Sequence, residues 1–377
     1  MRAAARDDRP IADDVLTDRQ LNRATLARQL LLDRAADRSV AGAVAHLVGM
    51  QAQEPKNPYV ALWSRLAGFD ATDVETLLLD RTLVRIVCLR GTIHLVTADD
   101  ALVLRPLCQP VLDGELTRHP EVRPVLASGV DLEPVLAFAR ALLAEQGPRT
   151  QAQIRAAMAE RFPRLHAPGL AYVVRNRLPM VQVPPRGLWW RSGQVVTTTT
   201  DLWLERPLVE PSAAVEETVV LRYLAAFGPA TVADVATWSR LTKQRAILDR
   251  LRSRDMVVTF RDGKGRELFD LPDAPRPDPD TPAPPRILPE YDNVLLSHAD
   301  RSRFAHPGGG PPIGRERFAG TALVDGVPAA TWARGADGEL VVDHVRLPKQ
   351  DRAELEREAQ RFAAFVDAPD VRLRESP

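Results

Sequence analysis

The chain has few cysteines and no long apolar run, and both absences narrow the class of protein. Its two cysteines, Cys88 and Cys108, stand in apolar surroundings, which favours reduced, packed thiols over a disulfide framework. The sequence contains no run of about 18 apolar residues, so no membrane-spanning helix is predicted. The charged N-terminus lacks the apolar core of a secretory signal. The seven scattered histidines show no metal-ligand spacing. We therefore expect a cytoplasmic protein with no membrane partner, metal or organic cofactor.

A net charge is also lacking, because 50 basic residues balance 50 acidic ones. This argues weakly against a nucleic-acid partner, since such proteins are usually basic. The charges are nevertheless segregated. Residues 140–200 hold nine arginines against two glutamates, and residues 235–266 hold nine basic residues against three aspartates. Segregation of this kind can give one face a phosphate-binding field, although two solvated faces of an arginine-rich chain would leave the same pattern.

Three segments repeat one order of elements, in which helices lead through a turn to a basic helix and a β-hairpin. The third segment is the clearest, with helices expected at Glu216–Phe227, Val232–Ser239 and Lys243–Arg254. Alternating strands follow at Met256–Phe260 and Arg266–Leu271. This is the order of a winged helix, a helix-turn-helix variant that presents one helix to the DNA major groove.

The first two segments repeat the pattern with more variation. In the second, helices are expected at Leu132–Glu145, Gln151–Arg161 and Leu170–Leu178, with wing strands at Met180–Val183 and Leu188–Arg191. In the first, helices are expected at Asp18–Leu32, at Val40 to about Gln53, at Pro58–Leu66 and at Ala71–Leu79, with hairpin strands at Val84–Leu89 and Thr92–Val96.

The C-terminal part differs from these segments. A proline- and aspartate-rich linker is expected at Pro272–Pro285, followed by short strands within 287–347 and a closing helix at Lys349–Val366. The predicted fold class is therefore α+β and mostly α, with three tandem winged helices and a small β-rich module. The expected boundaries are 1–130, 131–210, 211–275 and 276–377.

The stretch LVGMQAQEPKNP, residues 47–58, is the strongest candidate for chemistry. An apolar helix is expected to end there in two glutamines, Gln51 and Gln53, before prolines force an extended exit. If the backbone has left the helix, an i, i+2 pair can point to one side. Alternatively, the glutamines hydrogen-bond the last carbonyls of that helix. A second triplet, Gln151–Gln153, is expected to begin an ordinary exposed helix, so the triplet alone has low specificity.

Two stretches resemble the AlkZ/YcaQ-like winged-helix DNA glycosylases. One is residues 16–104, which include LTDRQLNRATLARQLL, VAHLVGMQAQEPKNPYVALWSRL and VRIVCLRGTIHLVTADD, and the other is residues 288–302, with LPEYD and LLSHADRS. The resemblance implies three winged helices and a C-terminal β-barrel-like element. It places Gln51 and Gln53 on the Gln-X-Gln motif of the branch that unhooks interstrand crosslinks.

The implied activity is that of a monofunctional DNA glycosylase acting on cationic N-alkylated purines, N7-alkylguanine above all. The resemblance also implies unhooking of crosslinks left by a DNA-alkylating natural product, and hence either self-resistance or general repair. An N7-alkylated guanine leaves readily, so water needs positioning more than deprotonation. Two neutral amides can position water with no charge to desolvate. Glu54, next to the pair, is an alternative base.

Two further groups of residues are expected to contact DNA. One is the hairpin with Arg90 and His94, although His94 would equally suit a half-buried strand. The other is a charged loop that would otherwise simply be solvated; its residues are His298, Asp300, Arg301 and Arg303. Trp189 and Trp190 can either stack on a base or divide into one core ring and one surface ring.

The expected partner is double-stranded DNA with alkylated bases. A monomer is expected, because three DNA-binding modules in one chain remove the usual need for a dimer. The alternative is a non-catalytic winged-helix regulator or architectural protein, or a silent lesion-binding protein, in which the glutamines would be structural.

Overall fold

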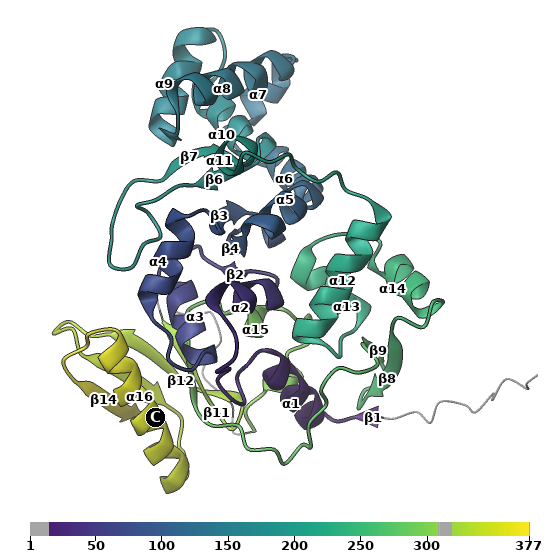
Figure 1. The fold of residues 1–377 in the computed structure, drawn as a ribbon, viewed down its shortest axis with the longest axis vertical. Coiled ribbons are helices and arrows are strands. Elements are labelled where there is room, and N and C mark those ends of the chain that lie inside the picture. The colour runs from purple at the N-terminus through teal and green to yellow at the C-terminus, as the bar shows by residue number, and fades with distance from the viewer. Residues whose placement is uncertain (1–14, 308, 310–318, 377) are drawn as a thin grey trace, which may run out of the picture.

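A central six-stranded sheet organises the protein (Figure 1). The computed structural model describes residues 15–307, 309 and 319–376, so the charged N-terminal segment and part of the β-rich module lie outside the description. All strand pairs of the central sheet are antiparallel. Its strand order is β2 (Met50–Gln51), β4 (Ile93–Thr97), β3 (Leu83–Val87), β6 (Met180–Gln182), β7 (Val196–Thr199) and β5 (Arg149–Thr150). Because β3 pairs with β6, the first two segments share one sheet, and β2 is one of its edges.

A helix was expected from Val40 to about Gln53, and the prediction of its C-terminal end is wrong. The helix α2 covers only Val40–His46 and is capped by the Ser39 side chain. Val48 has a φ of 54° and Gly49 a φ of 87°, and such left-handed residues terminate a helix. Any side chain on Gly49 would meet Val96, whose Cγ1 would lie 2.6 Å from the added Cβ. The chain therefore reverses and enters β2, and the glutamines lie on a sheet edge.

The rest of the first segment follows the prediction closely. Helix α4 matches in full, and the hairpin of β3 and β4 turns through Leu89–Gly91 as expected. Three helices beyond the hairpin were not anticipated. The helices of this segment are α1 (Asp18–Arg28), α2, α3 (Asn57–Arg65), α4 (Ala71–Leu79), α5 (Ala98–Leu107), α6 (Gln109–Leu116) and α7 (Arg123–Ala127).

The second segment lies at the top of Figure 1 and needs one correction. Its wing strand was expected at Leu188–Arg191, but β7 is Val196–Thr199 and the earlier residues form a loop. The sequence did not predict this longer loop, because Leu188-Trp189-Trp190 is apolar, as a strand would be, but does not form one. The helices are α8 (Glu133–Gln146), α9 (Gln151–Arg161), α10 (Ala167–Arg177) and α11 (Thr200–Leu204).

The third segment matches the prediction element by element. Thr231 caps α13 in a capping box, as its position before the helix predicts. One strand from outside joins its hairpin, because β1 (Val15–Leu16) pairs in parallel with β8. The elements are α12 (Ala213–Phe227), α13 (Val232–Ser239), α14 (Gln244–Arg252), β8 (Val258–Asp262) and β9 (Glu267–Asp270). That the three segments are winged helices stays a prediction.

The C-terminal module is a five-stranded sheet covered by α16 (Lys349–Phe365). Among the described residues its edge strands, β10 and β14, do not pair with each other, so the expected barrel-like element is an open sheet. The last strand was not anticipated. The strands are β10 (Arg286–Leu288), β11 (Gly320–Val324), β12 (Val327–Arg334), β13 (Leu340–His344) and β14 (Val371–Glu375), and α15 (Asn293–Leu296) precedes β11.

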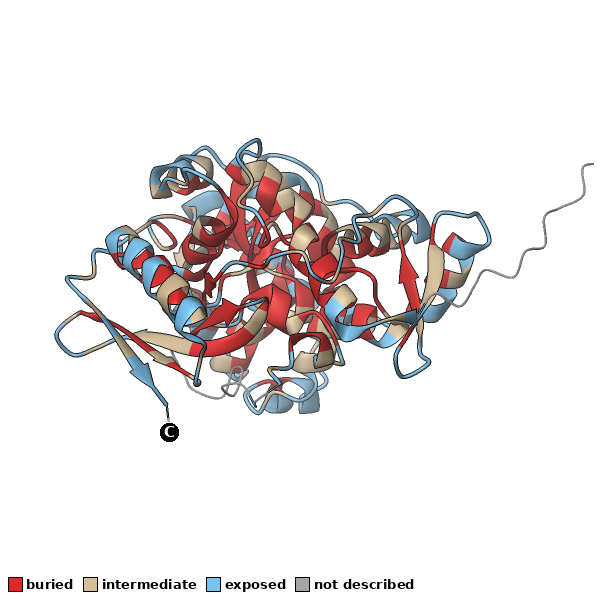
Figure 2. Ribbon diagram, turned by 90° about the horizontal axis from the view of Figure 1, so that it is seen from below, coloured by how far each residue is buried: buried red, intermediate tan, exposed pale blue. Residues whose placement is uncertain are grey.

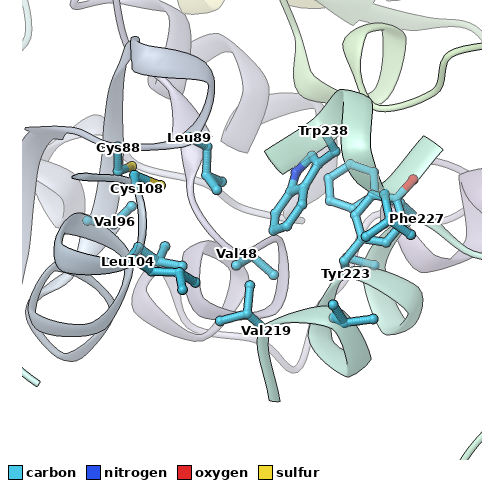
Figure 3. Close-up of a cluster of buried hydrophobic side chains, with 14 of the residues drawn as sticks. Val48, Cys88, Leu89, Val96, Leu104, Cys108, Val219, Tyr223, Phe227 and Trp238 are labelled. Atoms are coloured by element: carbon cyan, nitrogen blue, oxygen red, sulfur yellow. The ribbon is translucent and has the colours of Figure 1, made fainter. Parts of the chain in front are cut away.

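The largest hydrophobic core joins the segments instead of lying within one (Figure 3). Val48, Cys88 and Cys108 of the first segment lie in one cluster with Tyr223 and Trp238 of the third. Both cysteines are free and fully buried, and burial raises the pKa of the Cys88 thiol to about 12. Buried residues accordingly concentrate along the middle of the molecule (Figure 2).

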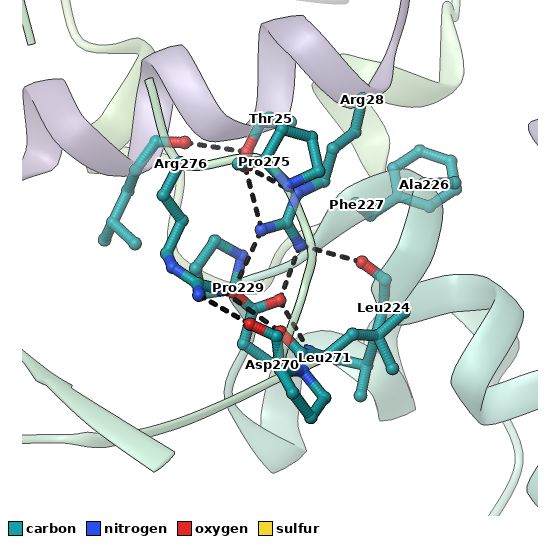
Figure 4. A network of polar contacts seen from close by, with 12 residues as sticks. Thr25, Arg28, Leu224, Ala226, Phe227, Pro229, Asp270, Leu271, Pro275 and Arg276 are labelled. Atoms are coloured by element: carbon teal, nitrogen blue, oxygen red, sulfur yellow. Dashed lines mark hydrogen bonds and ion pairs between the residues drawn. The ribbon is translucent and has the colours of Figure 1, made fainter. Parts of the chain in front are cut away.

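The proline-rich segment expected as a linker is held firmly in place. Arg28 of α1 donates to the Pro275 carbonyl at 3.2 and 3.1 Å and forms an ion pair with buried Asp270 at 2.6 Å (Figure 4). Arg276 adds a second ion pair to Asp270 at 2.5 Å. The C-terminal part is therefore fastened to α1 and to the third segment. Among the described helices, none has the length and hydropathy that crossing a membrane requires.

Candidate active site

The Gln-X-Gln motif lies on a backbone that is fixed on both sides. Gln51 pairs with His94 across β2 and β4, and the Ala52 N–H donates to the Ile93 carbonyl at 2.8 Å. Ala52 is fully buried, whereas Gln51 is half-buried and Gln53 is exposed. Strand β2 ends at Gln51 and Gln53 follows in a bend, so the two glutamines flank a buried Ala52 that anchors the backbone between them.

The side chains of this pair are largely uncommitted. Within the described residues, the one hydrogen bond that either makes is from the Gln53 backbone N–H to the Gln51 Oε1, at 3.3 Å. They do not bond the carbonyls at the end of α2, as the alternative interpretation required. The second triplet behaves differently: Gln153 completes a capping box with Thr150, and the Gln151 Nε2 donates to the Ala171 carbonyl at 2.8 Å. The second triplet is structural.

Beneath the motif lies a buried arginine that the sequence did not single out. The Arg85 Nη2 donates to the Ala52 carbonyl at 2.8 Å, between the two glutamines. Arg85 is 1% exposed, and its Nε and Nη1 have no hydrogen-bond partner among the described residues. Burial lowers the pKa of Arg85 to about 10. Gly187 leaves room for this side chain, since a Cβ there would lie 2.7 Å from the Arg85 Cδ.

A small cavity adjoins Gln51. It is lined by residues of the first segment and of the C-terminal part, among them Gly49, Arg65, Asp292 and Asn293. About 10 Å³ is open to the centre of a water molecule, which is roughly the room that one water needs. The Arg65 Nε is buried and has no partner among the described residues. The Arg65 Nη1 and Nη2 donate to the two oxygens of the Asp292 carboxylate at 2.9 and 2.8 Å. Arg65 is therefore held by Asp292 at the wall of this cavity.

The predicted DNA contacts Arg90 and His94 lie behind the motif. Arg90 donates to the Asn293 Oδ1 at 2.7 Å and to the Trp238 carbonyl at 3.1 Å. His94 is fully buried between the Thr92 carbonyl at 3.0 Å and the Arg90 Nη2 at 3.3 Å. Burial, and then the Arg90 charge, lower the pKa of His94 to about 3. His94 is therefore neutral and has no exposed surface for a phosphate; the half-buried-strand alternative describes it better.

The predicted loop of His298, Asp300, Arg301 and Arg303 also turns mostly inward. His298 is buried with its Nε2 3.0 Å from the Phe227 carbonyl, and Arg303 is buried against Thr25 at 3.0 Å. Asp300 pairs with Lys264 at 2.5 Å and Arg266 at 2.7 Å. Arg301 is exposed. In this conformation the loop ties the third segment to α1, and only Arg301 offers a free surface to DNA.

The two basic regions differ in how far their charge is compensated. In the third segment, Glu217 pairs with Arg250 and Arg254, and Glu267 pairs with Arg245 and Arg252. In the second segment, several exposed arginines make no ion pair within the described part of the chain. These are Arg140, Arg155, Arg161, Arg164 and Arg175. Uncompensated basic residues are therefore more numerous in the second segment than in the third, where the exposed Arg240 and Lys243 also make no ion pair among the described residues.

Comparison with known proteins identifies the family. Residues 44–365, which include both glutamines, match the family model described as DNA glycosylase AlkZ-like. The chain belongs to the AlkZ-like DNA glycosylase family. It is therefore an enzyme, a DNA glycosylase, and DNA is its partner. This replaces the alternative of a non-enzymatic regulator.

Among solved structures, the chain is similar to the DNA glycosylase AlkZ of Streptomyces sahachiroi. The TM-score is 0.68 at 21% identity, and the match covers 96% of this chain and 100% of that one. At this identity the likeness supports a shared fold and nothing further. A search of curated proteins found no match.

The residues that sequence reasoning missed share one signal. Arg85 interrupts the apolar strand LVRIV, and Arg65 follows the helix residues YVALWS. A charge inside an otherwise apolar run is expensive to bury unless it has a role. Their partners at Ala52 and Asp292 are distant in the sequence, so only the folded chain reveals what they hold.

Proposed function

We propose that this AlkZ-like chain hydrolyses the N-glycosidic bond of cationic N-alkylated purines in double-stranded DNA, N7-alkylguanine above all, through Gln51 and Gln53. The observation that carries the proposal is the pair of uncommitted amides on either side of Ala52, whose backbone N–H donates to the Ile93 carbonyl and whose carbonyl accepts from Arg85. Side chains kept free on a fixed backbone are pre-organised for a ligand.

The chemistry follows from the charge on the lesion. The bond between C1′ and the base nitrogen breaks, its electron pair neutralises the cationic base, and positive charge develops on the sugar. Water then adds to C1′ and releases its proton to solvent. Amide oxygens can orient that water and stabilise the developing charge through dipoles. The cavity beside Gln51 offers room for such a water.

Glu54 is the alternative base within the motif. It is exposed and lines a different cavity from Gln51. Two neutral amides without a carboxylate favour bases that are already charged, and neutral lesions such as uracil are expected to be poor substrates. We extend the proposal to interstrand crosslinks because Gln53 is exposed, so that a large adduct can approach its side chain.

The decisive experiment measures base release. DNA carrying N7-methylguanine is incubated with the protein and heated in alkali, which cleaves at abasic sites. Gln51→Ala and Gln53→Ala are each expected to lower the rate at least ~100-fold, in line with the loss of a pre-organised transition-state contact. Gln151→Ala is the matched control and is expected to keep full activity. Unchanged release by both motif variants would contradict the proposal.

Monofunctional and monomeric behaviour complete the proposal. Lys56 is the lysine near the motif, and its Nζ lies 3.6 Å from the centre of the Trp190 ring. Because the proposed nucleophile is water and not this amine, borohydride trapping is expected to give no covalent adduct with DNA. Sedimentation of the protein is expected to give a single monomeric species.

A further inference from the structure

A second cavity opens immediately beyond the catalytic motif. Its volume is about 300 Å³, within the range of small-molecule sites. Glu54 and Lys56 line it directly after Gln53, and its walls carry three indole rings, those of Trp189, Trp190 and Trp332. The motif chemistry does not explain why three tryptophans gather here.

The three rings are held differently. The Trp189 ring stacks on Phe365 with centroids 5.1 Å apart, and the Trp332 Nε1 donates to the Leu288 carbonyl at 2.8 Å. Trp190 is 44% exposed and has a left-handed φ of 56°. Such a backbone is strained for a bulky residue and concentrates at functional sites. Two rings therefore belong to the protein interior, and the third is presented to the cavity.

The face of Trp190 already attracts cations. The Lys56 ammonium lies 3.6 Å from its ring centre, and the Arg334 guanidinium carbon lies 5.4 Å from it. Glu54 and Glu290 line the same cavity and balance the charges of Lys56 and Arg334, so a cation that displaces the Lys56 ammonium keeps the lining neutral. Partial burial lowers the pKa of Lys56, because the ammonium has lost hydration there. A delocalised cation loses less hydration energy than an ammonium and stacks better on an indole.

From this geometry we infer that the cavity binds the alkylated purine itself, a planar ring with delocalised positive charge, which stacks on Trp190 in place of the Lys56 ammonium. The inference rests on the proposed function and names where its base is held. Lys56 is three residues from Gln53, so their backbones are at most about 11 Å apart. A nucleotide whose sugar lies at the glutamines can therefore place its base in the cavity.

This site has a kinetic consequence. The stacked base is cationic before bond cleavage and neutral afterwards, so its attraction to Trp190 falls when the bond breaks. The contact therefore holds the substrate more strongly than the transition state or the product. Loss of Trp190 is therefore expected to raise KM and also to raise kcat, because the contact stabilises the bound substrate more than the transition state. Loss of a residue that only supported the fold would not raise both constants in this way.

The first test measures binding without any chemistry. Full-length protein is titrated with 7-methylguanosine, below neutral pH where it is cationic, and with neutral guanosine, using tryptophan quenching. We expect tighter binding of the cation. Trp190→Ala is expected to weaken it about fivefold or more and Trp190→Phe less, as for a partly exposed cation–π contact. Lys56→Met is expected to strengthen it by removing the competitor. Equal binding of guanosine, or weaker binding in Lys56→Met, would overturn the inference.

The second test separates this inference from the proposed function. KM and kcat for release of N7-methylguanine from DNA are measured with Trp190→Ala and Lys56→Met. Opposite changes in KM support the site. Normal release with unchanged KM in both variants contradicts the site and leaves the glycosylase proposal intact. Absence of release by the wild-type protein contradicts the glycosylase proposal, and the nucleoside titration still decides whether the cavity prefers the cation.

Discussion

Arg85 shows how a single buried residue can position a site through the backbone of that site, without a side chain exposed to the substrate. Its guanidinium bonds the carbonyl between the two glutamines, and the rest of its polar atoms are unpartnered in the described part of the chain. Burying a guanidinium in this way costs stability. An arrangement that costs stability next to the motif is best explained by positioning of the Ala52 backbone.

Arg85→Met tests this role. We expect kcat for base release to fall roughly ten- to hundredfold, because small misplacements of catalytic groups have effects of that size. The free energy of unfolding is expected to change by less than about 2 kcal/mol, since an apolar side chain of similar length replaces a poorly satisfied charge. Single-turnover rates and urea unfolding measure the two quantities. A loss of stability with full activity would contradict the positioning role.

The buried histidines predict a pH dependence of stability. The pKa of His94 and of His298 is lowered from 6.5 to about 3, in both cases mainly by burial. Between those pH values the unfolded chain binds protons that the folded chain does not, so the free energy of unfolding falls as the pH falls. Urea unfolding at a series of pH values measures the slope. His298→Gln is expected to make it shallower, and an equal slope in this variant would refute the assignment.

At the scale of elements, the reversal between α2 and β2 decides where the motif lies. The helix stops at His46, and Val48 and Gly49 take left-handed conformations before the edge strand begins. Without this reversal Gln51 and Gln53 would lie on different sides of a helix. The geometry of the candidate site is therefore set by three residues that do no chemistry.

Gly49→Ala is expected to reduce both stability and activity. A left-handed alanine costs about 1 kcal/mol, and the contact with Val96 adds roughly 1–3 kcal/mol of overpacking. Gly68→Ala is the control, because Gly68 has a φ of 66° but no atom within 4 Å of an added Cβ. Thermal unfolding and base release are measured for both. Similar losses in the two variants would mean that the Val96 contact is unimportant.

The helices of the second segment are expected to supply the phosphate contacts. Arg155→Gln on α9 should weaken binding to undamaged DNA and lower the slope of log affinity against log salt by about 1. Arg250→Gln on α14 is the matched control, since Arg250 is already paired with Glu217 at 2.9 Å. Fluorescence anisotropy over a range of salt measures both slopes. A larger change in the control would show that the third segment, and not the second, supplies the phosphate contacts.

At the scale of the whole molecule, the segments are interlocked. The central sheet joins the first two, the largest core joins the first and third, and α1 holds the proline-rich segment. Each segment looks like a separate module in the sequence, but its apolar surface is completed by another. The motif is thus held by residues from across the chain, including Asn293, whose Nδ2 donates to the Gly49 carbonyl at 3.2 Å.

Asp270→Asn tests this interlocking. Asp270 is fully buried and accepts ion pairs from Arg28 and Arg276, and removal of one partner from a buried pair costs about 3–5 kcal/mol. We expect a lower midpoint in denaturant with one cooperative transition retained, because the segments share a core. Intrinsic fluorescence and circular dichroism should report the same midpoint. Separate transitions would show that the segments unfold independently.

The sequence by itself determined most of the local structure. Thr150, Thr231 and Ser39 fixed helix starts, because a side-chain cap depends only on neighbouring residues. The hairpin of β3 and β4 followed from alternating apolar residues around Arg90-Gly91 in the same way. The Gln-X-Gln motif was likewise visible, and it lies within residues 44–365, which match the family model.

Only the tertiary structure decided what the motif's neighbours do. It buried His94, His298 and Arg303, which the sequence placed at DNA, and it put Arg85 under the motif. It also gathered Trp190 and Trp332, more than a hundred residues apart, around one cavity. These outcomes depend on which surfaces meet when distant segments pack, and burial and pKa follow from that packing. Local residue patterns carry no such information, so the sequence could name the two amides but could not reveal the environment that holds them.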